Sequence, residues 1–498
     1  MGLNTLDLIV IVVYLAAVTL FGLRFRGKHR TLRNYFLADN TIPWWAISLS
    51  ILAAETSTLT IISVPALAYE KDFRFLQWII GYIVGRIIVS IVLIPQYFRG
   101  QLVTAYELIE QRFGGGLRSL TAGLFLITRA AAEGVRVFAV AIVIRVALGG
   151  VMSGLNDFER DFTAIAIVTV LTLAYTFEGG MTAVIWTDVV QLSVYLTGAL
   201  MAAYSILRVV PGGWQTIHGI AENANKFHML DTSWKLSATY TLWAGVIGGA
   251  FFTTASHGTD QLIVQRLLSA RNERQAQMAL LSSGVAVFFQ FSMFLVIGVM
   301  LFAFYKLFPP SVSFKRTDMI FPTYIVSQLP HGVGGLLISA ILAAAMSNLS
   351  AALNSLSSTT IVDFYARMSP LSTEEHRVRL SRIATLGWGV LLFGLALLAR
   401  NGGKVLEMGL SIASVAYGSL LGVFLLGVLT KRASERGAML GMIFGFVFNL
   451  YLWLFTGIAF TWYVAMGSTI TFLVGYSASW LMPQRVVLQQ TCETAKSG

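Results

Sequence analysis

The sequence AAAMSNLSAALNSLSS, residues 343–358, determines how the rest of the chain is interpreted, because it places polar side chains inside the apolar run 336–362. On a helix, one face of this stretch carries the oxygen atoms of Ser347, Ser350, Asn354 and Ser358. One interpretation is close helix packing, since small residues let helices approach and Ser hydroxyls bond across the contact. The other is a set of oxygen ligands for a hard cation such as Na⁺, bound where a second helix is unwound.

The composition identifies a polytopic membrane protein. Of 498 residues, 56% are hydrophobic and 12% are charged, and the mean hydropathy is +0.73. The net charge of +11 does not indicate nucleic acid, because the basic residues lie in short segments between apolar runs, as positive-inside topology requires. The single cysteine, Cys492, excludes an intrachain disulfide.

The apolar runs predict about thirteen transmembrane helices. Their expected ranges are 5–23, 43–69, 77–97, 119–149, 162–178, 183–208, 239–258, 276–306, 336–363, 383–399, 404–429, 437–456 and 459–481. The first run has no cationic leader region, so we expect a retained helix and not a signal peptide. The distribution of Arg and Lys places the N-terminus outside and predicts a multi-pass protein of the plasma (inner) membrane.

Four arginines lie within these spans: Arg86, Arg129, Arg136 and Arg145. Each costs at least about 2.5 kcal/mol at the bilayer centre, so each needs a partner or an aqueous cavity. Arg86 and Arg145 are nearer the span ends, and we expect them to snorkel or to form structural pairs. Arg129 and Arg136 are seven residues apart and share one helix face, with Arg136 nearer the middle.

Two spans are predicted to be interrupted. The first contains AAETSTLTIIS, residues 53–63, whose polarity suggests a broken helix lining a cavity. Back-bonding of hydroxyls to the preceding turn would explain its Ser and Thr residues but not Glu55. The second carries Gly245, Gly248 and Gly249, which can break or kink a helix. Asp188, early in another span, is a membrane-embedded carboxylate with either a functional role or a structural ion pair.

Four motifs, in this order and spacing, resemble the sodium/solute symporter family over almost the whole chain. They are TAYELIEQRFG (104–114), YTFEGGMTAVIWTDVVQ (175–191), HGTDQLIVQR (257–266) and AAAMSNLSAALNS (343–355). The resemblance implies an all-α polytopic fold that works by alternating access, with two inverted five-helix repeats (LeuT-like) after an extra N-terminal helix.

The implied division of the chain has five parts. Residues 1–42 form the extra helix and a basic cytoplasmic loop, and residues 43–209 form the first repeat. An extracellular loop follows at 210–238, the second repeat spans 239–430, and two further helices with a short tail occupy 431–498.

The resemblance also implies where sodium binds. The main site matches Ala53 and Thr56 on the first broken helix and Ala344, Ser347 and Asn348 on the helix around residue 350. Many members have Ser where this chain has Asn348, whose amide oxygen is still a hard ligand. A second site in some members, including bacterial sialic acid symporters, matches Asp188, Ser347, Ser350 and Ala351. Ala351 has no side-chain oxygen, which weakens that site.

The family's solute pocket matches residues on several helices. They are Glu55, Ser57 and Thr60, then Phe73 and Gln77, then Arg136, and finally Asp260 and Gln261. In the sialic acid members an arginine clamps the solute carboxylate, and Arg136 matches it, with Arg129 in reserve. The alternative for Arg136 is an internal pair with Glu133 or Glu55.

We therefore expect a symporter that couples Na⁺ entry to import of a small polar solute, with a preference for a carboxylate-bearing sugar such as sialic acid. The alternative solute is a neutral monosaccharide, because the Asp260–Gln261 pair resembles that of sodium/sugar members. A polytopic receptor or membrane enzyme is the other class, but no signalling domain is evident and the spans contain neither H-E-x-x-H nor G-x-S-x-G. The expected partners are Na⁺, the solute and the bilayer, without an enzyme activity, a nucleic acid or an obligate protein partner.

Overall fold

The computed structural model describes residues 3–24, 38, 41–99, 102, 105–175, 180–310 and 313–482. Most of the basic loop after the first helix, the Glu178–Gly179 turn and the tail with Cys492 lie outside the described residues. Within the described part, the only β-type pairing is one isolated bridge between Ile42 and Ala270, so the fold there is all-α.

The first half of the chain begins with a single helix and continues with a helix broken in its middle. Its helices are α1 (Thr5–Leu23), α3 (Trp44–Glu55), α4 (Thr58–Glu70), α5 (Phe75–Val92), α6 (Ile94–Arg99), α7 (Ala105–Phe113), α8 (Gly115–Ala147), α9 (Asp157–Tyr175), α10 (Gly180–Val209) and α11 (Gly213–Asn223).

The second half again begins with a broken helix, which here starts with a π-helical turn. Its helices are η2 (Ala244–Gly248), α12 (Gly249–Gly258), α13 (Gln261–Leu268), α14 (Glu273–Leu307), η3 (Thr317–Met319), α15 (Ile320–Gln328), α16 (Val333–Thr359), η4 (Thr360–Tyr365), α17 (Ala366–Met368), α18 (Glu374–Ala399), α19 (Val405–Leu429), α20 (Glu435–Phe455), η5 (Phe460–Trp462) and α21 (Tyr463–Leu481).

Each predicted span overlaps a helix, but the predicted number is not confirmed. Nine helices of the described ranges are individually long and apolar enough to cross a membrane, or ten if α3 and α4 count as one span. Helices α8 and α9 fall short because they carry more charge, and α12 falls short because it has ten residues. The predicted division into two repeats at 43–209 and 239–430 stays a prediction.

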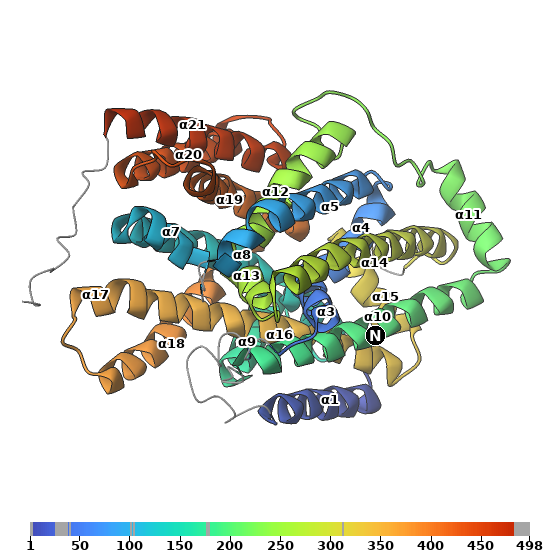
Figure 1. Cartoon of the computed structure of the whole chain (residues 1–498). Coiled ribbons are helices and arrows are strands. Elements are labelled where there is room, and N and C mark those ends of the chain that lie inside the picture. Colours follow the sequence, from blue (N-terminus) through green and yellow to red (C-terminus); the bar gives the residue numbers. More distant parts are fainter. Residues whose placement is uncertain are drawn as a thin grey trace, which may run out of the picture.

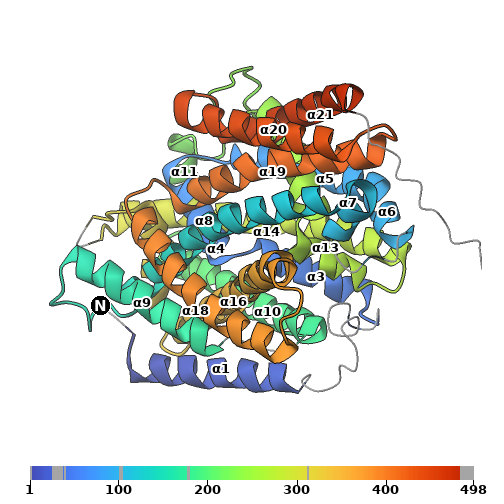
Figure 2. The ribbon, with the colours of Figure 1, turned by 90° about the vertical axis from the view of Figure 1, so that its left-hand side faces the viewer.

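The broken helices lie in the middle of the molecule. Helix α1 lies along one edge and α20 and α21 lie along the opposite edge, with α3, α4, α5, α12 and α14 between them (Figure 1; Figure 2). Helix α1 is fixed to the start of α16, because the buried carboxylate of Asp7 accepts the backbone N–H groups of Gly332 (2.7 Å) and Gly335 (3.2 Å).

The first break lies where the sequence predicts it. Helices α3 and α4 are bent by 65°, and Thr56 between them has a non-helical backbone (φ −82°, ψ 70°). The second break lies elsewhere: α12 continues past the glycines to Gly258, and the chain leaves the helix at Thr259 and Asp260. Gly249 instead allows close packing, because a Cβ there would lie 2.6 Å from the carbonyl oxygen of Trp78 on α5. The glycines therefore mark a π-helical turn, Ala244–Gly248, while the break of this span lies further along the chain than they indicate.

Candidate functional site

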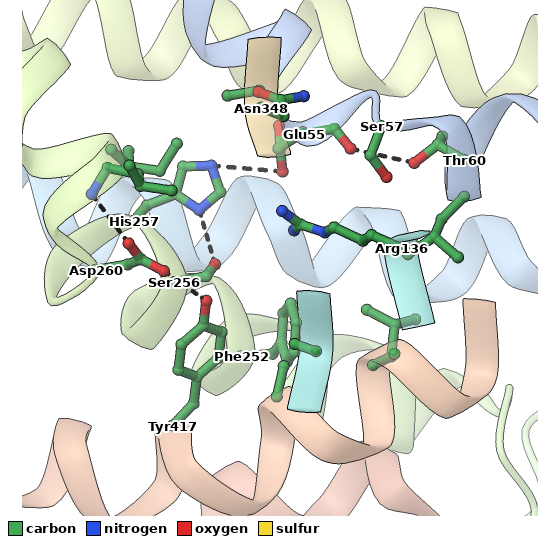
Figure 3. A pocket seen from close by; sticks show the side chains of 18 of the residues that line it. Glu55, Ser57, Thr60, Arg136, Phe252, Ser256, His257, Asp260, Asn348 and Tyr417 are labelled. Atoms are coloured by element: carbon green, nitrogen blue, oxygen red, sulfur yellow. Dashed lines mark hydrogen bonds and ion pairs between the residues drawn. The ribbon is translucent and has the colours of Figure 1, made fainter. Parts of the chain in front are cut away.

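A cavity of about 190 Å³ lies between the two breaks. Its lining comes from both broken helices and from α5, α8, α14, α16 and α19, so segments far apart in sequence meet there (Figure 3). Among the residues predicted to form sites, those that line it are Glu55, Ser57, Thr60, Arg136, Asp260 and Asn348.

The first break frees backbone oxygen atoms. The N–H of Ser57 would bond to the carbonyl of Ala53 in a continuous helix, but it bonds to the carbonyl of Glu55 (2.9 Å). The hydroxyl of Thr60 donates to the same Glu55 carbonyl (3.1 Å). The carbonyl of Ala53 thus lacks its usual helical donor, which suits a cation ligand.

Thr56 shows how the break is supported. Its hydroxyl donates to the carbonyl of Leu52 (2.7 Å) and accepts from the amide of Gln290 on α14 (2.7 Å). Sequence reasoning missed Gln290, although an amide in the middle of a long apolar helix is a signal for an intramembrane polar contact.

Helix α16 contributes two residues to the cavity wall, and neither belongs to the face that carries Ser347, Ser350, Asn354 and Ser358. Asn348 and Ala351 line the cavity, whereas Ala344 and Ser350 are buried and Ser347 is half-buried. Amide, hydroxyl and carbonyl oxygens are hard donors that suit Na⁺ better than a soft transition metal. No group of three or more His, Cys, Asp or Glu side chains with metal-binding geometry occurs among the described residues.

Asp188 forms a buried ion pair. One carboxylate oxygen lies 2.9 Å from Nη2 of Arg266 on α13 and accepts the hydroxyl of Ser50 on α3 (2.6 Å). Nε of Arg266 also donates to Ser50 (2.9 Å). The structural alternative for Asp188 is therefore present in the molecule, and its role in sodium binding, with Ser350, stays a prediction.

Helix α8 carries a ladder of charges into the cavity. Glu133 lies 2.9 Å from Nη1 of Arg136 and 2.9 Å from Nη2 of Arg129, and Nη1 of Arg129 lies 3.7 Å from the carboxylate of Asp260. The side chain of Arg136 is 31% exposed, and its guanidinium points into the cavity (Figure 3). The predicted internal pair with Glu133 is therefore present, yet it leaves part of the guanidinium facing the cavity.

The other two intramembrane arginines form structural pairs. Arg86 is fully buried, pairs with Glu55 and lies 3.1 Å from Nε2 of His257. Arg145 pairs with Asp157 (2.7 Å) and Asp161 (2.5 Å). This confirms the expected pairing.

The second break is held by side chains. Asp260 caps α13 by accepting the N–H of Leu262 (2.9 Å), and it accepts the hydroxyl of Tyr417 on α19 (2.8 Å). The imidazole of His257 lies 3.4 Å from the carboxylate of Glu55 across the cavity wall and 2.9 Å from the hydroxyl of Ser256 (Figure 3). Sequence reasoning missed His257 and Tyr417, although a histidine within a span by itself indicates a functional site.

Three predicted solute ligands lie outside this cavity. Gln261 accepts the N–H of Ala105 (2.7 Å). The backbone N–H of Phe73 donates to the carbonyl of His228 (3.1 Å), and Gln77 bonds to Asp231 and Tyr240 (3.1 Å each). These contacts hold neighbouring chain segments together, and the predicted role of these residues in solute binding stays a prediction.

A cluster of aromatic rings lies beside the cavity at the start of α5. Phe75 stacks on Phe291 (centroids 5.5 Å apart) and packs edge-on against Tyr240 (5.2 Å). Phe75 and Tyr240 also line a second cavity, of about 170 Å³. The rim there is linked by ion pairs, including Lys71 with Glu407 (3.3 Å).

Two broken helices that meet at a cavity lined by both charged and apolar side chains are typical of secondary transporters. The model of the sodium:solute symporter family matches residues 35–445, and the chain belongs to this family of sodium-coupled membrane transporters.

Two curated relatives span nearly the whole chain. The sodium/sialic acid symporter NanT of Aliivibrio fischeri is 30% identical over 483 residues, which is 95% of this chain and 92% of that protein. The sodium/sialic acid symporter SiaT of Proteus mirabilis is 28% identical, with 97% of each chain covered.

A solved structure of a Na⁺-coupled sialic acid symporter, substrate-bound and outward-open, superposes with a TM-score of 0.80. It is 28% identical and covers 96% of this chain and 98% of its own. The fold class expected from the sequence, apart from the number of helices, is thereby confirmed.

Proposed function

We propose that the protein imports a small monocarboxylate of the sialic acid type together with Na⁺ by alternating access. The observation that carries this proposal is the guanidinium of Arg136, which faces the cavity and shares its one carboxylate partner with Arg129. A guanidinium fork suits a planar carboxylate, and charge-assisted pairs of this kind are among the strongest hydrogen bonds in proteins. Two relatives that span nearly the whole chain carry sialic acid.

The charge balance of the site supports a monoanion. Four arginines, Arg86, Arg129, Arg136 and Arg266, face four carboxylates, Glu55, Glu133, Asp188 and Asp260. The polar centre is therefore neutral without cargo. One Na⁺ and one monoanion together keep it neutral, which avoids a net charge in a region of low dielectric.

The main sodium site is proposed at the first break. Its ligands are the oxygens of Ala53 and Thr56 together with Ala344, Ser347 and Asn348. The Ala53 carbonyl, which lacks its helical donor, and the position of Asn348 in the cavity wall support this assignment. Glu55, Ser57, Thr60 and Asp260 are proposed to contact the solute, since they line the same cavity.

A neutral monosaccharide is the second candidate. The cavity wall contains Phe75, Tyr82, Phe252 and Phe291, and such rings pack well against the apolar face of a sugar. Asp260 and Tyr417 offer the polar atoms that sugar hydroxyls need. A neutral sugar, however, leaves the exposed part of the Arg136 fork without an anion.

The test is uptake of N-acetylneuraminate and of glucose into proteoliposomes with an inward Na⁺ gradient or with K⁺ alone. We expect Na⁺-dependent uptake of the acid, reduced at least about tenfold in Arg136→Ala. Equal uptake in K⁺ would reject sodium coupling. Preferred uptake of glucose, undiminished in Arg136→Ala, would establish the neutral-sugar alternative.

A further inference from the structure

The carboxylate of Glu133 lies between two arginines but forms a hydrogen bond with only one of them. Its side chain is 1% exposed, and its Oε1 atom lies 2.9 Å from Nη1 of Arg136 and 2.9 Å from Nη2 of Arg129. The contact to Arg136 is a well-aligned hydrogen bond. The Nη2 atom of Arg129 is too poorly aligned for one, and within the described part of the chain Nε of Arg129 and Oε2 of Glu133 are buried without a hydrogen-bond partner.

These unpaired atoms belong to groups that fit one another. A carboxylate has two oxygens and can accept a bidentate arginine, and Arg129 has two unpaired nitrogens beside Glu133. Buried polar atoms without a partner are costly, so this arrangement favours a second one in which they meet. Spacings of three and four residues place all three side chains on one face of α8, so the change requires only rotation of side chains.

We propose that Glu133 exchanges partners when the solute binds. The solute carboxylate binds the guanidinium of Arg136. The Glu133 side chain then rotates so that both of its oxygens accept hydrogen bonds from Arg129. The inference rests on the proposed function, because it requires an anionic solute on Arg136. Glu133 is then a positioning residue: in the empty cavity it occupies Arg136 as an internal anion, and its release satisfies atoms that are otherwise unpaired.

This exchange gives the site a preference for anions. A solute carboxylate replaces the interaction that Arg136 gives up, whereas a neutral sugar would leave Glu133 on Arg136 and gain no pair. The contact of Arg129 with Asp260 (3.7 Å) keeps Arg129 beside Glu133 in both arrangements.

The experiment compares the KM and the maximal rate of Na⁺-driven N-acetylneuraminate uptake in proteoliposomes. The variants are Glu133→Gln, Arg129→Gln and the double variant, and folding is checked by thermal unfolding. The control is Asp161→Asn, because Asp161 is also a buried carboxylate between two arginines, Arg145 (2.5 Å) and Arg400 (2.9 Å), but lies outside the cavity.

Glu133→Gln removes the competing anion, so we expect its KM to fall about fivefold or more. Arg129→Gln removes the receiving partner, so we expect its KM to rise about threefold or more. The double variant should have the low KM of Glu133→Gln, and Asp161→Asn should keep the wild-type KM. A merely structural role would not change the KM in opposite directions in the two single variants. It would also not make Arg129→Gln without effect on the KM once Glu133 has been replaced.

The double variant decides the matter if Glu133→Gln does not fold, because it removes one positive and one negative charge and so leaves the net charge of the site unchanged. A KM equal to or above that of the wild type in the double variant would overturn the exchange and indicate that Arg129 touches the solute directly. Failure of the proposed function has a different result: the wild type itself would show no Na⁺-dependent uptake of N-acetylneuraminate, and the exchange would fall with it.

Discussion

The two broken helices differ in what their breaks expose. Between α3 and α4 the break leaves the Ala53 carbonyl without its helical donor, and this is an observation on which the proposed sodium site rests. Between α12 and α13 the break is capped by Asp260, whose carboxylate is already used by Leu262 and Tyr417. The comparison teaches that a break can provide an ion site or a rigid wall, depending on whether side chains satisfy the freed backbone groups.

The two breaks are also joined to each other. Glu55 at the end of α3 pairs with Arg86 and lies 3.4 Å from His257 near the end of α12. On the other side, Asp188 links Ser50 of α3 to Arg266 of α13. Helix α3, the first half of one broken helix, is therefore held to α13, the second half of the other, by buried charges. We expect these two half-helices to move together.

The largest effect is expected when this connection is broken at Arg86. Arg86→Met leaves the Glu55 carboxylate without its main partner, and removing one member of a buried pair costs about 3–5 kcal/mol. We expect a much lower thermal unfolding midpoint in detergent. Glu55→Gln/Arg86→Met removes both charges and should recover most of the loss. A double variant as unstable as Arg86→Met would show that the cost is one of packing, and the charge pair of Glu55 with Arg86 would then not be what stabilises this connection.

A smaller and more specific effect is expected at the first break alone. Ser347→Ala removes one proposed sodium ligand from α16, so we expect the Na⁺ concentration for half-maximal uptake to rise about tenfold with little change in unfolding temperature. Ser339→Ala is the matched control, because Ser339 is a buried serine of the same helix whose hydroxyl bonds to the carbonyl of Leu336 (2.7 Å). If both variants keep the wild-type Na⁺ dependence in folded protein, Ser347 is not a ligand.

The comparison of the breaks also shows which of them could be located from the sequence. The cluster of Ser, Thr and Glu after Ala53 predicted the first break. Such residues are costly in contact with lipid, so their presence within a span indicates a break that lines a cavity. The glycines of the second span were expected to break or kink it, and they coincide with a π-helical turn and with close packing against Trp78, but the break itself lies at Thr259 and Asp260. Glycine density does not distinguish a bend from a close approach of two backbones.

Long-range partners were harder to predict than elements. The arginine ladder on α8 follows from helical spacing, so Arg136 with Glu133 was a stated alternative. The pair of Asp188 with Arg266 joins residues 78 positions apart, and Gln261 bonds to Ala105 over 156 positions. Such contacts depend on how helices are placed in three dimensions, which hydrophobic periodicity does not specify.

The last prediction concerns the number of sodium ions and has the smallest expected effect. If only the first break binds Na⁺, one Na⁺ enters with one monoanion and the loaded carrier moves no net charge. A second Na⁺ would add one charge, worth about 2.3 kcal/mol or about fiftyfold in accumulation per 100 mV. Asp188 is bound by Arg266 and Ser50, and Ala351 offers no side-chain oxygen, so we expect one ion. Initial N-acetylneuraminate uptake should then be the same at zero and at −100 mV, imposed with K⁺ and valinomycin. Uptake that rises steeply with an inside-negative potential in the wild type would instead show a second ion, and its loss in Asp188→Asn would assign that ion to Asp188.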